Sequence, residues 1–284
     1  MNVLPNLALT LIPANVDPVA FLALGIGAAV LVGVAKAGFG GAIGLLATPT
    51  MVLACAGDPD SAKLATAILL PVLIFVDQFA LLSWWRRWDW SVVALLLPGA
   101  VVGIAAGAGA FAALEHLEKT RTKDYADAWL TLAIGVIAVA FVAIQLIRHL
   151  RRKPMPFRPV LWQGTAFGMA AGFTSTLTHG AGPITAMYLL PQNLPKETYA
   201  ASTVMYFWIN NLLKLPVYIL LGRFSADSAG ATLLFLPAAA AGTAFGVLLC
   251  RRLGQKQFNI VVYVLLSLAG VKLIHQSLAV LIGG

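Results

Sequence analysis

Charged residues are scarce in this 284-residue chain, in which only 11% are Asp, Glu, Lys or Arg and 60% are hydrophobic. A soluble domain of this size carries roughly a quarter charged residues, so the chain lacks the polar side chains that would cover a water-exposed surface. Its mean hydropathy is +0.88, and the apolar residues fall in long blocks. These features exclude an ordinary soluble fold and predict a protein whose main solvent is lipid.

Cysteine and enzyme motifs are also scarce. Cys55 and Cys250 lie far apart in apolar blocks, so we expect buried thiols rather than a disulfide or a metal site. The chain has no G-x-x-x-x-G-K-[ST] motif for ATP and no G-x-S-x-G nucleophile motif. We therefore expect no enzyme and no cofactor. The net charge of +8 is gathered in short loops, which favours membrane orientation over nucleic-acid binding.

Apolar blocks between polar breaks predict ten helical segments, and hence an all-α polytopic membrane protein. Most are long enough to cross about 30 Å of hydrocarbon, but the second and seventh are short and follow glycine-rich breaks. We interpret these two as the returning arms of re-entrant hairpins, and whether they cross the membrane is left open. The segments are expected at about 18–37, 42–57, 61–84, 91–113, 127–149, 161–178, 183–192, 197–222, 228–250 and 257–281.

Glycine and proline recur in the same order in both halves of the chain. Residues 38–41 (Gly-Phe-Gly-Gly) are followed after seven residues by Pro49, and residues 180–183 (Gly-Ala-Gly-Pro) are followed after seven residues by Pro191. Further along, a second set recurs with identical spacing: Pro98, Gly103 and Gly107 match Pro237, Gly242 and Gly246. The order predicts an internal repeat.

Each predicted repeat holds five segments, so the second would enter the membrane from the opposite face, as in many secondary transporters. We predict two inverted-topology repeats at 1–147 and 161–284, joined by a basic linker at 148–160. The basic residues of this linker, of 86–87 and of 251–256 fall on one face if the segments alternate. That face is expected to be cytoplasmic, with both termini outside.

The glycine breaks are the first candidate site. Broken backbone in lipid is costly unless it lines a cavity or is buried in protein, and the start of a helix offers free N–H groups and a positive dipole end to an anion. Close helix packing is the alternative reason for such glycines. The break residues proposed to bind substrate are Gly38, Gly40, Gly41, Gly180, Gly182 and Pro183.

Polar side chains near the breaks extend this site. Lys36 precedes the first break and His179 the second, although a lysine there could simply neutralise its own helix end and a histidine could be structural. Asp77 is expected to pair with a lysine or to take up a proton, which makes it and Gln78 coupling candidates. The other substrate-binding candidates are Ser175, Thr178, Asn211 and Lys214, of which the hydroxyl residues could instead bond their own helix.

A family resemblance follows from these residues. The stretch Gly172-Phe-Thr-Ser-Thr-Leu-Thr-His-Gly-Ala-Gly-Pro183, continued by Met187-Tyr-Leu-Leu-Pro191, resembles the second-repeat signature of the sulfite exporter TauE/SafE family. Lys36-Ala-Gly-Phe-Gly-Gly41 resembles its first-repeat glycine motif. The resemblance implies a permease of the bacterial inner membrane, with sulfite, sulfoacetate or a related organosulfonate as substrate. Ala42 and Ala181 depart from the family's pattern, which leaves the substrate open.

The sequence therefore predicts a secondary transporter for small sulfur oxyanions, working by alternating access. An anion channel and, more remotely, an intramembrane enzyme around His179 remain alternatives. The expected partners are the small anion and the lipid bilayer, with no nucleic acid. Homodimer formation, the direction of transport and the coupling ion are left open.

Overall fold

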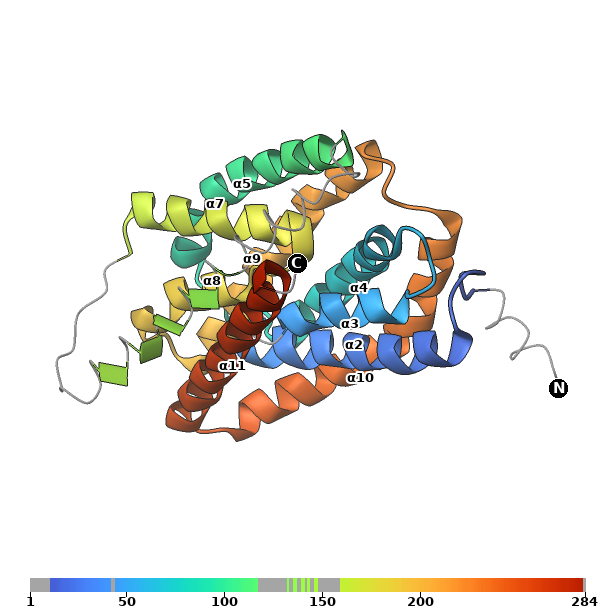
Figure 1. Cartoon of the computed structure of the whole chain (residues 1–284). Coiled ribbons are helices and arrows are strands. Elements are labelled where there is room, and N and C mark those ends of the chain that lie inside the picture. The colour runs from blue at the N-terminus through green and yellow to red at the C-terminus, as the bar shows by residue number, and fades with distance from the viewer. Residues whose placement is uncertain are drawn as a thin grey trace.

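A computed structural model describes residues 11–41, 44–116 and 159–282, with scattered helical positions between 132 and 147. In these residues the regular elements are helices (Figure 1), which confirms the all-α class. In chain order they are α2 (Pro18–Phe39), the 3-10 turn η1 (Gly44–Leu46), α3 (Ala47–Ala54), α4 (Ser61–Ser83), α5 (Trp90–His116), α7 (Leu161–Thr178), α8 (Gly182–Leu189), the 3-10 turn η2 (Leu190–Gln192), α9 (Lys196–Leu220), α10 (Ala226–Arg252) and α11 (Gln255–Ile282).

These helices match the predicted segments to within a few residues. The two short segments become α3 and α8, helices of 8 residues each, with a 3-10 turn before α3 and after α8. The predicted segment at 127–149 and the basic linker at 148–160 fall largely outside the described residues. The division of the chain into two repeats therefore stays a prediction.

Local capping explains where several helices begin. The Asp17 side chain accepts a hydrogen bond from the Ala20 N–H at 2.7 Å, and Pro18 occupies the first turn of α2. A capping box between Ser225 and Ser228 opens α10. Pro183 lies in the first turn of α8, where its missing N–H costs nothing. At these three helices a polar or proline residue in the apolar sequence thus marks the helix start.

The helices form two tightly packed pairs with two central helices between them. Helix α2 packs along α10, and α5 packs along α7, while α4 and α9 contact one another between the pairs (Figure 1). Helix α4 also contacts α10, and α9 also contacts α5. The first helix of each predicted repeat therefore packs on the fourth described helix of the other half.

Glycines allow the close approach within both pairs. A Cβ on Gly33 would lie 2.5 Å from the Thr243 nitrogen of α10, and a Cβ on Gly38 would lie 2.6 Å from the Gly246 carbonyl oxygen. In the other pair, a Cβ on Gly99 would collide with the Thr165 carbonyl. Helix axes with small residues between them approach closely enough for backbone contact, so the repeated glycines shape the scaffold as well as the breaks.

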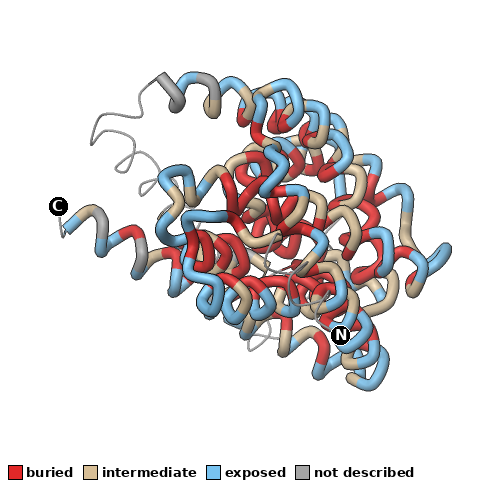
Figure 2. The backbone as a smooth tube through the Cα atoms, turned by 90° about the vertical axis from the view of Figure 1, so that its right-hand side faces the viewer, coloured by how far each residue is buried: buried red, intermediate tan, exposed pale blue. Residues whose placement is uncertain are grey.

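Five of the described helices are long and apolar enough to cross a membrane: Pro18–Phe39, Ser61–Ser83, Trp90–Phe111, Ala226–Arg252 and Gln255–Ala279. Large apolar side chains lie exposed on the outside, as on Leu82, Val101, Leu220, Leu233 and Leu268. Figure 2 shows the buried backbone gathered in the interior and the exposed positions around it. An apolar exterior around a polar-containing interior is the arrangement expected in lipid.

Candidate functional site

The first break ends α2 in a left-handed turn. Gly40 and Gly41 have φ of 65° and 76°, a conformation that glycine adopts without strain. The Gly40 and Gly41 N–H groups both return to the Ala35 carbonyl. Lys36 lies in the last turn of this helix and is only 6% exposed. The turn therefore places a buried lysine beside two buried glycines.

The second break ends α7 in the same way, but with histidine in the left-handed position. His179 has φ of 56°, and its N–H bonds the Ser175 carbonyl at 3.1 Å. A side chain in this conformation costs roughly 1–2 kcal/mol, and glycine would avoid that cost. The chain thus keeps a strained histidine at a helix end, and a role for the imidazole is the natural reason.

The two breaks meet. A Cβ on Gly41 would lie 3.7 Å from the Gly182 Cα, although the two glycines are far apart in sequence. Between them is a cavity of about 20 Å³. A cavity needs about 10–15 Å³ to hold a water molecule, so this one has room for about one water and is too small for a larger ligand unless the helices shift. Its lining residues are Lys36, Gly41, Gly44, Leu73, Ser175, His179, Gly182, Phe207 and Asn211.

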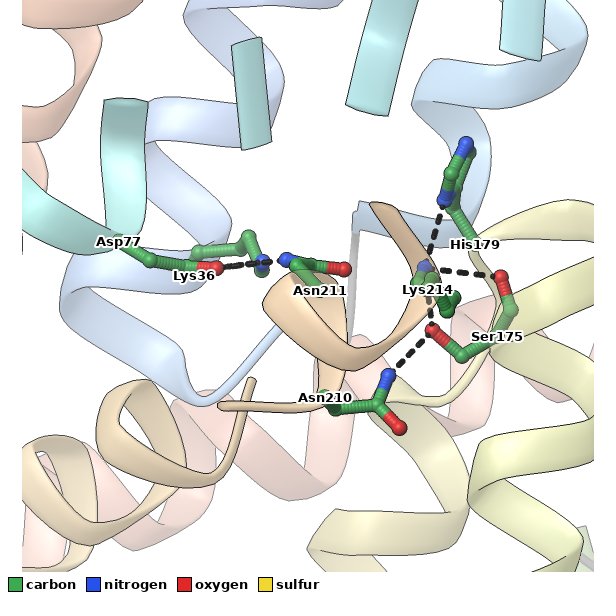
Figure 3. A network of polar contacts seen from close by, with 7 residues as sticks. All are labelled: Lys36, Asp77, Ser175, His179, Asn210, Asn211 and Lys214. Atoms are coloured by element: carbon green, nitrogen blue, oxygen red, sulfur yellow. Dashed lines mark hydrogen bonds and ion pairs between the residues drawn. The ribbon is translucent and has the colours of Figure 1, made fainter. Parts of the chain in front are cut away.

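One wall of the cavity belongs to a buried ion pair. The Lys36 ammonium donates to Oδ2 of Asp77 at 2.7 Å, and the Asn211 amide donates to the same oxygen at 2.6 Å (Figure 3). Asp77 is fully buried and joins α4 to α2 and α9. Phe207 lies 4.8 Å from the Lys36 ammonium, measured to its ring centroid, and adds a cation–π contact. The lysine pairing expected for Asp77 is present.

A second buried lysine lies behind the opposite wall, which Ser175 and His179 form. The Lys214 ammonium donates to the Ser175 carbonyl at 3.1 Å and to the Ser175 hydroxyl at 2.9 Å, and it lies 3.1 Å from Nδ1 of His179. Asn210 donates to the same hydroxyl at 2.9 Å (Figure 3). Lys214 is fully buried, and these partners carry no formal negative charge. The cation also caps the carbonyl end of α7.

The contacts of His179 define its proton position. Nε2 lies 3.2 Å from the Thr66 carbonyl oxygen, which can only accept, so Nε2 carries the proton. Nδ1 then accepts from the Lys214 ammonium. The imidazole is therefore neutral, and it links Lys214 of α9 to the Thr66 carbonyl of α4.

The predicted residues divide into four groups. Lys36, Ser175, His179, Asn211, Gly41 and Gly182 line the cavity, and Asp77 and Lys214 hold those side chains from behind. Gly38 packs against α10, and Gly40 packs against the Tyr199 ring. Gly180, and Pro183 in the first turn of α8, are buried but do not line the cavity. Thr178 bonds the Thr174 carbonyl of its own helix at 3.2 Å, and Gln78 lies exposed on α4, apart from the cavity.

Sequence reasoning did not single out several cavity neighbours. Leu73 and Phe207 line the cavity, but apolar side chains within an apolar helix give no signal of their own. Thr66 contributes a backbone carbonyl, which any residue could supply. Tyr218 donates to the Thr176 carbonyl at 2.9 Å and lies beside the His179 ring. Only the tertiary arrangement identifies these contacts.

The described residues contain no group of three His, Cys, Asp or Glu side chains placed to hold a metal ion. The His179 ring contacts a carbonyl and an ammonium group, whereas a hydrolytic triad needs a carboxylate to orient the histidine. Among the polar side chains that line the cavity, Lys36, Ser175 and Asn211 can donate hydrogen bonds, and Lys36 is cationic. Such a set suits an oxyanion.

Comparisons with known proteins bear on this arrangement. No curated protein and no solved structure matches the chain. The family model described as sulfite exporter TauE/SafE matches residues 24–273, which is nearly the whole chain. Together with the five long apolar helices, this match identifies a multi-pass membrane protein of a transporter family. The chain belongs to the sulfite exporter TauE/SafE family.

Proposed function

We propose that this protein is a secondary transporter for small sulfur oxyanions, such as sulfite, sulfoacetate or a related organosulfonate. The observation that carries the proposal is the cavity between the two helix breaks, lined by Lys36, Ser175, His179 and Asn211. The anion would be held there, with Gly41 and Gly182 allowing it to approach the backbone.

The donors suit a group with several oxygens on one centre. Lys36 and Asn211 approach from one side and Ser175 from the other, where the neutral His179 ring also lines the cavity (Figure 3). The Ser175 hydroxyl accepts hydrogen bonds from Lys214 and Asn210, which leaves its own proton for a ligand. Lys214 lies directly behind Ser175 and His179 and adds positive charge to that side. Desolvated donors of this kind bind an oxyanion more strongly than they would in water.

Alternating access fits the packing of the helices. In the proposed inverted repeats, α2 of one half packs on α10 of the other, and α7 packs on α5. This reciprocal arrangement supports two halves, 1–147 and 161–284, related by inversion. The cavity of about 20 Å³ is too small for an anion, so the helices around it would have to move before an anion could occupy it. A site that must enlarge to hold its ligand favours a carrier over an open channel.

We further propose that the protein lies in the bacterial inner membrane with both termini periplasmic. The basic residues at 86–87 and 251–256, and those of the linker at 148–160, support this orientation. Cys55 and Cys250 are the only cysteines, so their replacement gives a background for labelling. A cysteine placed at Arg252 should react with an impermeant maleimide only from the cytoplasmic side; reaction from outside would reverse the orientation.

Reconstituted protein tests the function directly. Proteoliposomes preloaded with unlabelled sulfite should take up radiolabelled sulfite by exchange, with saturation, and sulfoacetate should compete. Flux that fails to saturate would indicate a channel. Absence of exchange for sulfite, sulfoacetate and other sulfonates, in protein that unfolds cooperatively, would overturn the proposal.

A further inference from the structure

The two side chains that hold Asp77 are the same two that face the cavity. Lys36 and Asn211 both line it, and both donate to one oxygen of Asp77, Oδ2. Asp77 itself lies behind them on α4, fully buried, and does not line the cavity. An anion in the cavity and the Asp77 carboxylate therefore compete for the same two donors.

The second oxygen of Asp77 has a different environment. Oδ1 is buried and accepts no hydrogen bond from any residue that the structure describes. An ionised carboxylate in such a place is costly, because half of its negative charge has no donor. A proton bonded to Oδ1 would replace the buried charge with a neutral O–H, which costs less, without disturbing Oδ2. The carboxyl is therefore arranged to accept a proton when its donors are withdrawn.

The charged groups around Asp77 determine the net charge of the cluster that Lys36, Asp77 and Lys214 form. Asp77 pairs with Lys36 of α2 and is close enough to Lys214 of α9 to interact with its charge, and Lys214 in turn contacts the neutral His179. Helix α3 has no titratable residue, and those of α10 lie at its two ends: Asp227, Cys250, Arg251 and Arg252. With Asp77 ionised, the two lysines leave the cluster with one net positive charge.

We infer that Asp77 acts as an internal anion that the substrate displaces, so that the protein binds a proton together with each anion. When the anion binds, Lys36 and Asn211 turn their hydrogen bonds from Oδ2 to the anion. A proton from the aqueous phase then bonds to Oδ1, and the carboxyl becomes neutral. Release of the anion returns the proton to water and restores the Lys36–Asp77 pair. For a monoanion the charge of the cluster is the same whether it is loaded or empty.

This inference rests on the proposed transport function, and two modes of flux separate them. Net accumulation of radiolabelled sulfite driven by a pH gradient needs Asp77 to gain and lose a proton in each cycle. Exchange of labelled for unlabelled sulfite at equal pH needs only the loaded protein. The wild-type protein should show both modes. Absence of both would remove the transport function and the inference with it, whereas exchange without any response to the pH gradient would remove the coupling alone.

The decisive variant is Asp77→Asn, which keeps the side-chain shape but cannot exchange a proton. We expect gradient-driven accumulation to fall at least about tenfold while exchange persists, whatever its rate. Asp227→Asn, which changes an exposed acid in the first turn of α10, is the matched control and should keep both modes. Gradient-driven accumulation in Asp77→Asn at the wild-type level would overturn the coupling role.

A second measurement needs no variant. Sulfite added to the wild-type protein in weakly buffered detergent solution should cause uptake of about one proton per anion bound, after correction for the protonation of free sulfite. Binding at saturation with no proton uptake would contradict the inference, even if Asp77→Asn failed to fold.

Discussion

Two buried lysines lie on opposite sides of the cavity, Lys36 in its lining and Lys214 behind Ser175 and His179, and they differ in what balances their charge. Lys36 is held by the Asp77 carboxylate at 2.7 Å. Lys214 is held by the Ser175 carbonyl and hydroxyl and by the neutral imidazole of His179. Both are buried, but only Lys36 has a carboxylate among its hydrogen-bond partners.

Because of this difference, replacing each lysine should affect the stability of the fold and the binding of the anion to different extents. Breaking a buried ion pair leaves a charge without compensation and is strongly destabilising, whereas removing an isolated buried charge relieves a desolvation cost. Lys36 should therefore matter for both folding and binding, and Lys214 mainly for binding. The asymmetry also explains how one site can attract an anion while one of its lysines is neutralised.

The largest effect is expected from Lys36→Met, because it leaves Asp77 buried with Asn211 as its only donor. We expect a loss of up to about 3–5 kcal/mol in the free energy of unfolding, measured as a lower melting temperature in detergent. The loss should shrink at low pH, where a protonated Asp77 needs no counterion. The double variant Lys36→Met with Asp77→Asn should recover most of the stability; an unchanged melting temperature in Lys36→Met would contradict the role of the pair.

Next in size is the effect of Lys214→Met on anion affinity. Without Lys214 the remaining Lys36–Asp77 pair is neutral, so we expect affinity for sulfite to fall about 100-fold, or about 2.8 kcal/mol, by isothermal titration. The melting temperature should stay equal or rise. Lys63→Met, in the first turn of α4, is the control and should change neither. Equal destabilisation by Lys214→Met and Lys36→Met would end the contrast between the two lysines.

A smaller effect is expected where the two breaks meet. Gly41→Ala would place a Cβ 2.9 Å from the Phe207 ring in a backbone with φ of 76°, which costs roughly 1–2 kcal/mol for the conformation alone. Exchange flux should fall several-fold. The control is Gly27→Ala within α2, where the added Cβ meets no atom within 4 Å. This variant should leave the flux unchanged. If both variants behave alike, the first break does not shape the site.

The smallest effect is expected from an exposed ion pair. Arg87 and Glu197 lie 2.6 Å apart, but their side chains are 57% and 36% exposed. Surface pairs contribute about 0–1 kcal/mol, so Arg87→Ala should change the melting temperature little. A loss as large as that of Lys36→Met would mean that burial is not what distinguishes the two ion pairs.

The sequence predicted the helices and much of the site for different reasons. Long apolar blocks and proline or polar breaks are local signals, so the boundaries of α2, α4 and α10 could be predicted closely. Lys36 and His179 stood out because a charged or titratable residue next to a glycine break is costly in a membrane. That Thr178 and Gln78 lie away from the cavity could not be predicted. A helix that is apolar on all sides has no hydrophobic periodicity to indicate which face turns inward.

The neighbours of these residues depend on packing between distant segments. Asn211 reaches Asp77 only because α9 lies on α4, and His179 reaches the Thr66 carbonyl only because the second break lies against α4. Gly38 and Gly41 are close in sequence, yet one packs against α10 and the other lines the cavity. The sequence alone does not distinguish a packing glycine from a cavity glycine, whereas the tertiary fold does.

The most direct test is the position of a bound anion. Selenite is the selenium analogue of sulfite, and its anomalous scattering locates it in a crystal of the protein. We expect one selenium site between Gly41 and Gly182, with its oxygens within hydrogen-bond distance of Lys36, Ser175 and Asn211. A transport-competent protein that binds selenite only elsewhere, for example at the basic residues 251–256, would contradict an anion site at the meeting of the two helix breaks.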